Sequence, residues 1–133
     1  MNITFEKTKV KTLAWCTVDW TDLHALSCFV KECYNYKDLK SGKKITLDLI
    51  KNLLEEKLVI VGDLLESNKF KPWNKTTDEI LMQIKQKWDL LDRKLHPHEI
   101  VWFEITEKGK KEFQYLNSLP ELKETDPFYF DDK

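Results

Sequence analysis

The chain is poor in the residues that build tight turns, disulfide frameworks and phosphate-binding loops. Its 133 residues include only three glycines, four prolines and three cysteines, and its single arginine is Arg93. A chain with so few glycines has little material for a glycine-rich phosphate loop or a dinucleotide fingerprint, and neither motif occurs. The scarcity of glycine and proline instead favours long regular elements.

The sequence also lacks a long apolar run. No stretch approaches the roughly 20 residues that a membrane-spanning helix requires. The opening Met-Asn-Ile-Thr-Phe-Glu-Lys has no apolar core of the kind found in a secretory signal. The cysteines Cys16, Cys28 and Cys33 are odd in number and show no framework spacing, so we expect free thiols in a reducing compartment. We therefore expect a cytoplasmic protein without a membrane segment.

The composition that remains is that of an ordinary globular domain. Hydrophobic residues make up 41% and charged residues 34% of the chain, and this length suits one domain with its own core. The formal net charge is −1, so no overall field attracts nucleic acid or an anionic membrane. The charge is uneven: residues 1–45 hold eight lysines against five acids, and residues 117–133 hold five acids against two lysines.

Apolar positions at spacings of three and four predict four helices. The first starts near Trp20, with Thr21 or Asp19 as its cap, and the second starts at Thr46 after a basic loop at residues 37–44. The third begins with the capping box Thr76-x-x-Glu79 and stops at Pro97, and the fourth follows a cap at Thr106. We therefore expect helices at about residues 20–34, 46–57, 76–96 and 106–117.

Two short runs predict strands. Residues 58–61 form a β-branched run that Gly62-Asp63 would end with a turn. Residues 99–105 alternate, which places Val101 and Phe103 on one face and Trp102 and Glu104 on the other. Residues 1–12 also alternate and suggest an edge strand or an extended arm, whereas residues 65–75 read as a loop. The expected fold class is α+β: about four helices with a small antiparallel sheet, in one domain over residues 1–117, followed by an acidic, aromatic tail over residues 118–133.

Two segments resemble parts of a winged-helix domain. Residues 47–64, where Leu-Asp-Leu-Ile-Lys-Asn-Leu-Leu leads into Leu-Val-Ile-Val, resemble a recognition helix that runs into the first wing strand. Residues 102–113, with Ile-Thr-Glu-Lys-Gly-Lys, resemble the second wing strand and the helix start that follows it. The resemblance covers about a quarter of the chain. It implies a winged-helix-like scaffold in which the wing is expanded by a helix.

The same resemblance implies a DNA-binding transcription regulator, which we retain as the alternative function. Contacts to bases and phosphates come mostly from arginine, lysine, asparagine and glutamine. The matching helix carries Asp48, Glu55 and Glu56 against Lys51 and Lys57, and residues 34–46 leave little room for the positioning helix that should precede it. Nucleic acid is therefore not the expected partner.

A second resemblance is to small bacterial immunity proteins of toxin–immunity pairs, including those of contact-dependent growth inhibition. It depends on scattered positions: Asp19-Trp20, Gly62-Asp63, Phe70-x-x-Trp73, Trp88 and the run Glu-Ile-Val-Trp-Phe at residues 99–103. It implies a single-domain, non-catalytic protein that binds and neutralises a cognate protein toxin, often a nuclease. The sequence does not give the oligomeric state, and we expect one copy of the chain in a heterodimeric complex with the toxin. This is the leading expectation; a small enzyme of unrecognised type is the third.

The sequence offers one segment that suits such a partner. Residues 126–132, Asp-Pro-Phe-Tyr-Phe-Asp-Asp, place three aromatics between acids, whereas disordered tails are usually poor in aromatics. The aromatics either fold back on the domain or insert into a partner while the acids face a basic groove. Phe70 and Trp73 either close over the core or form an exposed anchor. The candidate partner-binding residues are Asp63, Phe70, Trp73, Glu124, Asp126, Phe128, Tyr129, Phe130, Asp131 and Asp132.

No catalytic, cofactor or metal site is expected. His96-Pro-His98-Glu99 matches no standard zinc spacing and is interpreted as an exposed turn. Cys28 and Cys33 lie five apart on a helix, so their side chains point about 140° apart and do not suit a redox pair. His24, on the same helix, is interpreted as a histidine at the edge of the core.

Overall fold

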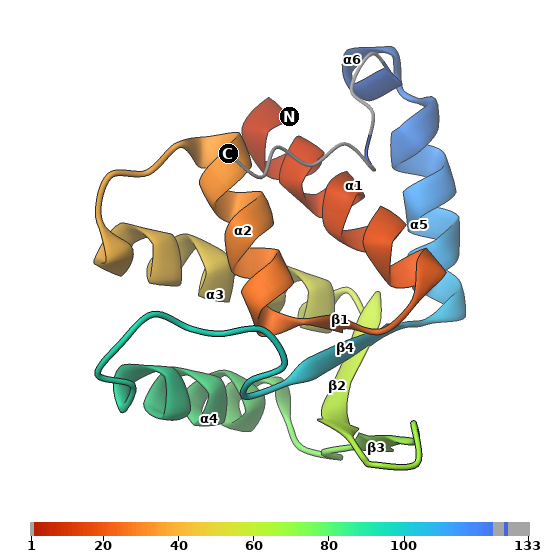
Figure 1. Cartoon of the computed structure of the whole chain (residues 1–133). Helices are drawn as coiled ribbons and strands as arrows, with labels where there is room; N and C mark the ends of the chain where they lie inside the picture. The colour runs from red at the N-terminus through yellow and green to blue at the C-terminus, as the bar shows by residue number, and fades with distance from the viewer. Residues whose placement is uncertain (1, 124–126, 128–133) are drawn as a thin grey trace.

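A computed structural model describes residues 2–123 and Pro127 of the chain. Within these residues the fold is α+β, as the sequence predicts, with more helices than the four expected (Figure 1). The elements are, in order, α1 (Ile3–Val18), β1 (Thr21–Asp22), α2 (Leu23–Tyr34), α3 (Leu39–Glu55), β2 (Val59–Leu64), β3 (Phe70–Pro72), α4 (Thr77–Asp89), β4 (Trp102–Ile105), α5 (Glu107–Ser118) and α6 (Pro120–Lys123).

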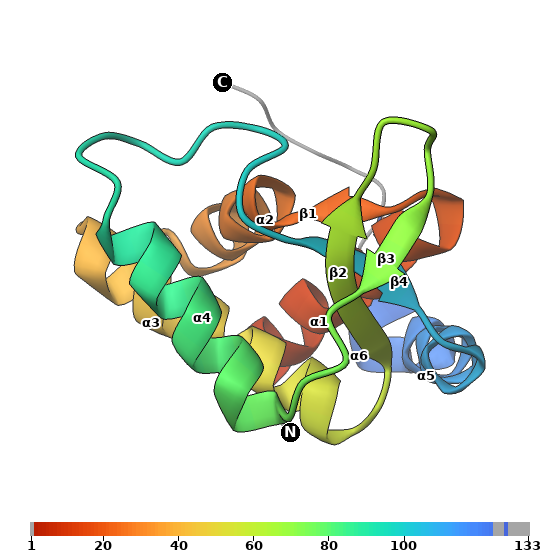
Figure 2. The same ribbon diagram turned by 90° about the horizontal axis from the view of Figure 1, so that it is seen from below.

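The four strands form one antiparallel sheet in the order β1-β4-β2-β3. The predicted pairing of β2 with β4 is confirmed, with Val61 opposite Phe103 and Gly62 opposite Trp102. Helices α1, α2 and α5 lie on one side of this sheet (Figure 1). Seen from the opposite side, no helix crosses in front of β1, β4 and β2, and α4 runs beside them (Figure 2).

Helix α1 replaces the edge strand or extended arm expected at residues 1–12. It contacts α2, α5, α6 and β4, so it is enclosed by other elements. A helix that does not expose one face to solvent need not show a 3.6-residue pattern of apolar and polar residues. Its buried residues are Thr8, Lys9, Val10, Lys11, Thr12, Leu13, Ala14 and Cys16.

Three buried polar side chains of α1, those of Lys9, Lys11 and Thr12, have partners. Lys9 Nζ lies 3.0 Å from Glu56 Oε2, and Lys11 Nζ lies 2.7 Å from Glu32 Oε1. The Thr12 hydroxyl donates to the carbonyl of residue 8, one turn earlier. Lysines can be buried in this way only when their charge is paired. These residues give α1 a polar sequence although it lies in the core.

Helices α2 and α3 begin at caps other than those predicted. Asp22, not Asp19 or Thr21, caps α2, because its side chain accepts from the amide of Ala25. Asp38 caps α3, so this helix includes most of the basic segment that was expected to be a loop. Thr46 lies inside α3 and its hydroxyl donates to the carbonyl of Gly42. The residues that precede Thr46 therefore belong to the helix.

The β2–β3 hairpin occupies a region that was predicted to be a strand followed by a loop. Strand β2 does not stop at Gly62-Asp63 but continues to Leu64. Phe70 lies in β3, opposite Leu64, rather than in a loop. The capping box at Thr76 is confirmed, but α4 ends at Asp89, well before Pro97. Residues 90–101 then form an irregular connection to β4.

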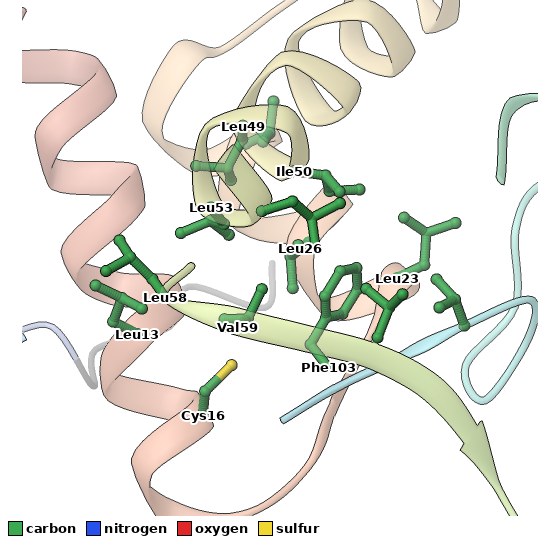
Figure 3. Packing of buried hydrophobic residues seen from close by; sticks show 14 of the residues in the cluster. Leu13, Cys16, Leu23, Leu26, Leu49, Ile50, Leu53, Leu58, Val59 and Phe103 are labelled. Atoms are coloured by element: carbon green, nitrogen blue, oxygen red, sulfur yellow. The ribbon is translucent and has the colours of Figure 1, made fainter. Parts of the chain in front are cut away.

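The core lies between the sheet and the helices on its covered side, and Figure 3 shows part of it around Phe103, Leu26 and Leu53. The cap at Thr106 and the inward position of Leu116 are confirmed. The packed structure continues past residue 117, where the tail was expected to begin, because Leu122 of α6 is buried. No helix in the part of the chain described here is long and apolar enough to span a membrane.

Replacing Lys57 with glycine is expected to stabilise the protein by about 1 kcal/mol. Lys57 follows α3 with a φ of 59°, in the left-handed region that glycine occupies without a steric penalty. Its amide donates to Leu54, and the amide of Leu58 donates to Leu53, as in a Schellman motif. Urea denaturation measures the change. An unchanged or lower free energy of unfolding would contradict it, and Lys51→Gly within α3 is the destabilising control.

Candidate functional site

Among the helices that the structure describes, none covers one face of the sheet, and we call the side chains on that face the outer sheet face. Strand alternation turns Val61 and Phe103 to the core, where they are 3% and 0% exposed. Their neighbours point the other way, and the indole of Trp20, just before β1, reaches across to Glu104. The outer sheet face consists of Trp20, Ile60, Gly62, Leu64, Phe70, Trp102 and Glu104.

Gly62 allows two aromatic rings to meet across this face. The rings of Trp20 and Phe70 are nearly parallel, with centroids 6.3 Å apart and planes at 12°. A Cβ at Gly62 would lie 2.8 Å from Phe70 Cζ and 2.3 Å from the carbonyl oxygen of Lys71. Glycine is therefore required by the close approach of β3 to β2, rather than by the turn that the sequence suggested. The result is a continuous half-exposed aromatic surface over β2.

Glu104 brings a carboxylate to this surface. The indole Nε1 of Trp20 donates to Glu104 Oε1 over 3.1 Å, and Ile60 lies opposite Glu104 across the pair of strands. The side chain is partly buried. None of the salt bridges among the described residues includes Glu104. The carboxylate is thus held by a neutral donor among apolar neighbours.

The connection from α4 to β4 places the imidazole ring of His98 beside this surface. The His98 ring stacks on Trp102 with centroids 5.3 Å apart. The His98 amide donates to Asp22 Oδ2 over 2.7 Å. His98 and Ile100 have φ values of 70° and 73°, which is rare for a β-branched residue such as isoleucine. Strained backbone of this kind persists where its surroundings fix it, and it is frequent at functional sites.

A charged clamp fixes the same connection. Arg93 donates to both oxygens of Glu99, at 2.9 and 2.7 Å, and the His96 amide donates to Glu99 Oε1 at 2.6 Å. These bonds, led by the one from Arg93, lower the pKa of Glu99 from 4.5 to about 2. The His-Pro-His-Glu segment is thus held as a turn, and no group of metal-binding side chains occurs in the described ranges.

The clamp predicts a pH dependence of this turn. Because folding lowers the pKa of Glu99, its contribution to stability is present above about pH 4.5 and is lost as the pH falls towards 2. Carboxyl-carbon NMR should give Glu99 a titration midpoint near 2, and Arg93→Gln should raise it. The matched control is Lys44→Gln, in an exposed pair with Asp48. A wild-type midpoint near 4.5 would show that the clamp does not form.

Only one of the predicted partner-binding residues that the structure describes belongs to the outer sheet face. Phe70 lies there, whereas Asp63 is exposed opposite Lys71 and points to the other side of the hairpin by alternation. Trp73 is half-buried against the core, with the Nζ atoms of Lys75 and Lys87 6.0 and 5.3 Å from its ring centroid. The predicted residues outside the described part of the chain are Glu124, Asp126, Phe128, Tyr129, Phe130, Asp131 and Asp132.

Sequence reasoning missed Trp20, Trp102 and Glu104 as site residues. Strand alternation had already separated Trp102 from Phe103, and this was the available signal. Trp20 was assigned instead to the apolar face of a helix, because its spacing to Leu23 fits one. In the structure that helix starts only after β1, so Trp20 is free to lie on the sheet.

The thiols of Cys16 and Cys28 are poorly suited to nucleophilic chemistry. Burial raises the pKa of Cys16 to about 12. The Cys28 thiol lies 3.8 Å from His24 Nε2, an arrangement that elsewhere can activate a nucleophile. Burial, followed by the charge of Asp22, raises the pKa of Cys28. The reactive thiolate is therefore disfavoured at both positions.

A groove of about 400 Å³ adjoins the outer sheet face between α3, β2 and the start of α4. Ile60 belongs to both the groove and that face. Its polar lining comes from lysine, threonine and asparagine side chains, without a carboxylate, histidine or cysteine. Such a lining can hydrogen-bond a ligand but does not supply an ordinary general base. Its residues are Leu54, Lys57, Val59, Ile60, Val61, Pro72, Asn74, Lys75, Thr77, Ile80 and Thr106.

Comparisons of the chain with protein-family models, with curated proteins and with solved structures find no match. The outer sheet face and the clamped turn beside it are therefore the features from which a function is inferred.

Proposed function

We propose that this protein is a non-catalytic inhibitor of the immunity type, which neutralises a cognate toxin by binding it through the outer sheet face. The observation that carries the proposal is the group of half-exposed aromatics Trp20, Phe70 and Trp102 on a sheet side that no helix crosses. Tryptophan and other aromatics are enriched at the centres of protein interfaces, where they contribute most of the binding energy.

The rigidity of this face also supports binding of a protein. Trp20 is held by its bond to Glu104 and by its ring contact with Phe70. Trp102 is held in β4 and covered on one side by His98, whose turn is fixed by the Arg93 clamp. Side chains that are already ordered lose little conformational freedom on association, so more of the contact energy appears as affinity.

Several side chains of the types that usually carry out catalysis are poorly suited to it in this protein, which favours a binding function. The raised pKa values of Cys16 and Cys28 disfavour a thiolate nucleophile. Glu99 has a lowered pKa and both of its oxygens are engaged by Arg93, so it is a poor proton acceptor at neutral pH. Catalysis by a small enzyme of unrecognised type would need a set of groups that these residues do not provide.

The test begins with a tagged pull-down from the native cells at moderate salt, followed by mass spectrometry. We expect one stoichiometric protein, whose toxicity the purified protein suppresses. Phe70→Ala and Trp102→Ala should each weaken this complex about 30-fold or more, as for central interface aromatics. Met82→Ala is the matched control, because Met82 is an exposed apolar residue on α4. Equal affinity for all three variants would place the interface elsewhere.

A winged-helix DNA-binding regulator is the second candidate, and the order of elements favours it. Helix α2 directly precedes α3, α3 leads into β2, and β4 pairs with β2 before α5 begins. In this order α2 takes the position of the helix that should precede the recognition helix, for which residues 34–46 alone left little room. Against it, Lys44 on the exposed side of α3 is paired with Asp48 at 2.9 Å, and α4 packs along α3 through the contact of Lys43 with Asp89.

A gel-shift assay at about 50 mM salt decides between these candidates, because binding to phosphates is strongest at low salt. A regulator would shift DNA, and Lys40→Gln with Lys51→Gln would weaken the shift. The inhibitor proposal expects no shift. A salt-dependent shift that the two substitutions remove would overturn it.

A further inference from the structure

We propose that the outer sheet face recognises an arginine side chain that projects from the partner protein, with Glu104 as the carboxylate that pairs with it. Trp20 and Trp102 would provide the aromatic surfaces on either side. This inference rests on the proposed function and adds the chemistry of the partner at the centre of the interface.

The first reason is the incomplete bonding of Glu104. The carboxylate is partly buried beside Ile60, and it accepts a hydrogen bond from the neutral indole of Trp20. A carboxylate that loses water without a cation to replace it is held at a cost in free energy. An arginine supplies paired N–H donors in the planar arrangement that fits a carboxylate. A partner with arginine at this point would therefore complete the site.

The second reason is the kind of side chain that surrounds Glu104. Trp102 lies two residues earlier on the same face of β4, and Trp20 contacts the carboxylate from the position just before β1. Tryptophan is the most favourable aromatic for a cation above its ring, and arginine is the cation found there most often. The flat guanidinium can stack on one ring while its edge bonds to the carboxylate.

The third reason is the sign of the nearby charge. Strands β1 and β4 and the turn before β1 contain Asp19, Asp22 and Glu104 but no lysine or arginine. On β3, the Lys71 side chain points to the opposite side from Phe70 by alternation. On β1, on β4 and in the turn before β1 the charged side chains are therefore all acidic, which is complementary to a basic group, whereas Lys57 and Lys75 belong to the groove that adjoins this face.

The test uses blocked tripeptides and the ¹⁵N-labelled full chain. Acetyl-Gly-Arg-Gly-amide is titrated while the indole N–H signals of Trp20 and Trp102 are followed by NMR. We expect saturable shifts of both signals with a weak Kd, of about 1 mM or more for so small a ligand. The citrulline peptide, which has the same shape without the charge, should shift neither signal.

Glu104→Gln is the decisive variant. Its amide oxygen can still accept from Trp20, so the fold is retained while the charge is removed. The affinity for the arginine peptide should fall about tenfold, the usual scale for a hydrogen bond to a charged group. Glu107→Gln, at an exposed acid of α5, is the matched control and should bind as the wild type does. Equal binding by Glu104→Gln, or equal shifts with a lysine or citrulline peptide, would overturn the proposal.

The two proposals fail in different ways. If Trp102→Ala abolishes binding of the captured partner and Glu104→Gln does not, the interface is correct and the assignment of arginine is wrong. If the peptide binds as expected but Phe70→Ala and Trp102→Ala leave partner binding unchanged, the arginine site exists and the proposed inhibitory interface is wrong.

Discussion

Replacing Gly109 with alanine is expected to lower the free energy of unfolding by about 3 kcal/mol or more, at the upper end of the range for overpacking. In an ordinary helix interior the same change would stabilise by about 1 kcal/mol. Here the Cβ would lie 2.1 Å from the carbonyl oxygen of Leu58 and 2.7 Å from Ile105 Cγ1. The steric term therefore exceeds the gain in helix propensity.

The obstacle at Gly109 cannot move aside easily. The Leu58 carbonyl accepts from both the amide and the hydroxyl of Thr106, each at 3.0 Å. To admit a methyl group, α5 must separate from the start of β2 and break these bonds. Urea denaturation of Gly109→Ala measures the loss.

Gly42→Ala provides the control for Gly109→Ala. A Cβ at Gly42 would meet the ring of Tyr36 at 2.4 Å, but this obstacle is a side chain that can rotate rather than a backbone carbonyl. The loss should therefore be much smaller. If Gly109→Ala proved as stable as the wild type, α5 would not lie as close to Leu58 as described.

Phe103→Ala is expected to destabilise the protein by about 3–5 kcal/mol. The side chain is 0% exposed and belongs to the main core cluster, near Leu26 and Val59 (Figure 3). Its removal leaves a cavity that the surrounding helices can fill only in part. The midpoint of thermal unfolding should fall by roughly 10–20 °C for a domain of this size.

The adjacent Trp102→Ala is the control for this experiment. Trp102 is the larger residue but lies half-exposed on the outer sheet face, where its ring stacks on that of His98. We expect it to cost under about half as much stability as Phe103→Ala. Equal losses at the two positions would mean that β4 does not present one face to the core and the other to solvent.

The parts of the fold that could be predicted are those whose signals are local. The capping box at Thr76 and the cap at Thr106 fix helix starts through side-chain bonds within one turn. The alternation around Phe103 is likewise a property of one strand. Helix α1 could not be recognised in this way, because its surroundings supply the partners of Lys9 and Lys11.

The candidate site was predictable only in fragments. Phe70 was selected as an aromatic in a polar segment, but its neighbour Trp20 comes from a position 50 residues earlier. Their contact depends on the hairpin register and on the missing side chain of Gly62, which no local pattern reveals. Trp73 is likewise an aromatic residue in the same polar segment, yet it packs against the core and does not belong to the outer sheet face.

The enclosure of α1 has a consequence for how the chain is made. Its neighbours include α5 and α6, which are synthesised about a hundred residues later. A nascent chain that already contains α1 and the sheet still lacks α5 and α6, two of the helices that pack against α1. The native core can therefore close only late in synthesis, and the early chain exposes surface that favours aggregation. Contacts between such distant segments also slow folding, since a large loop must be ordered before they form.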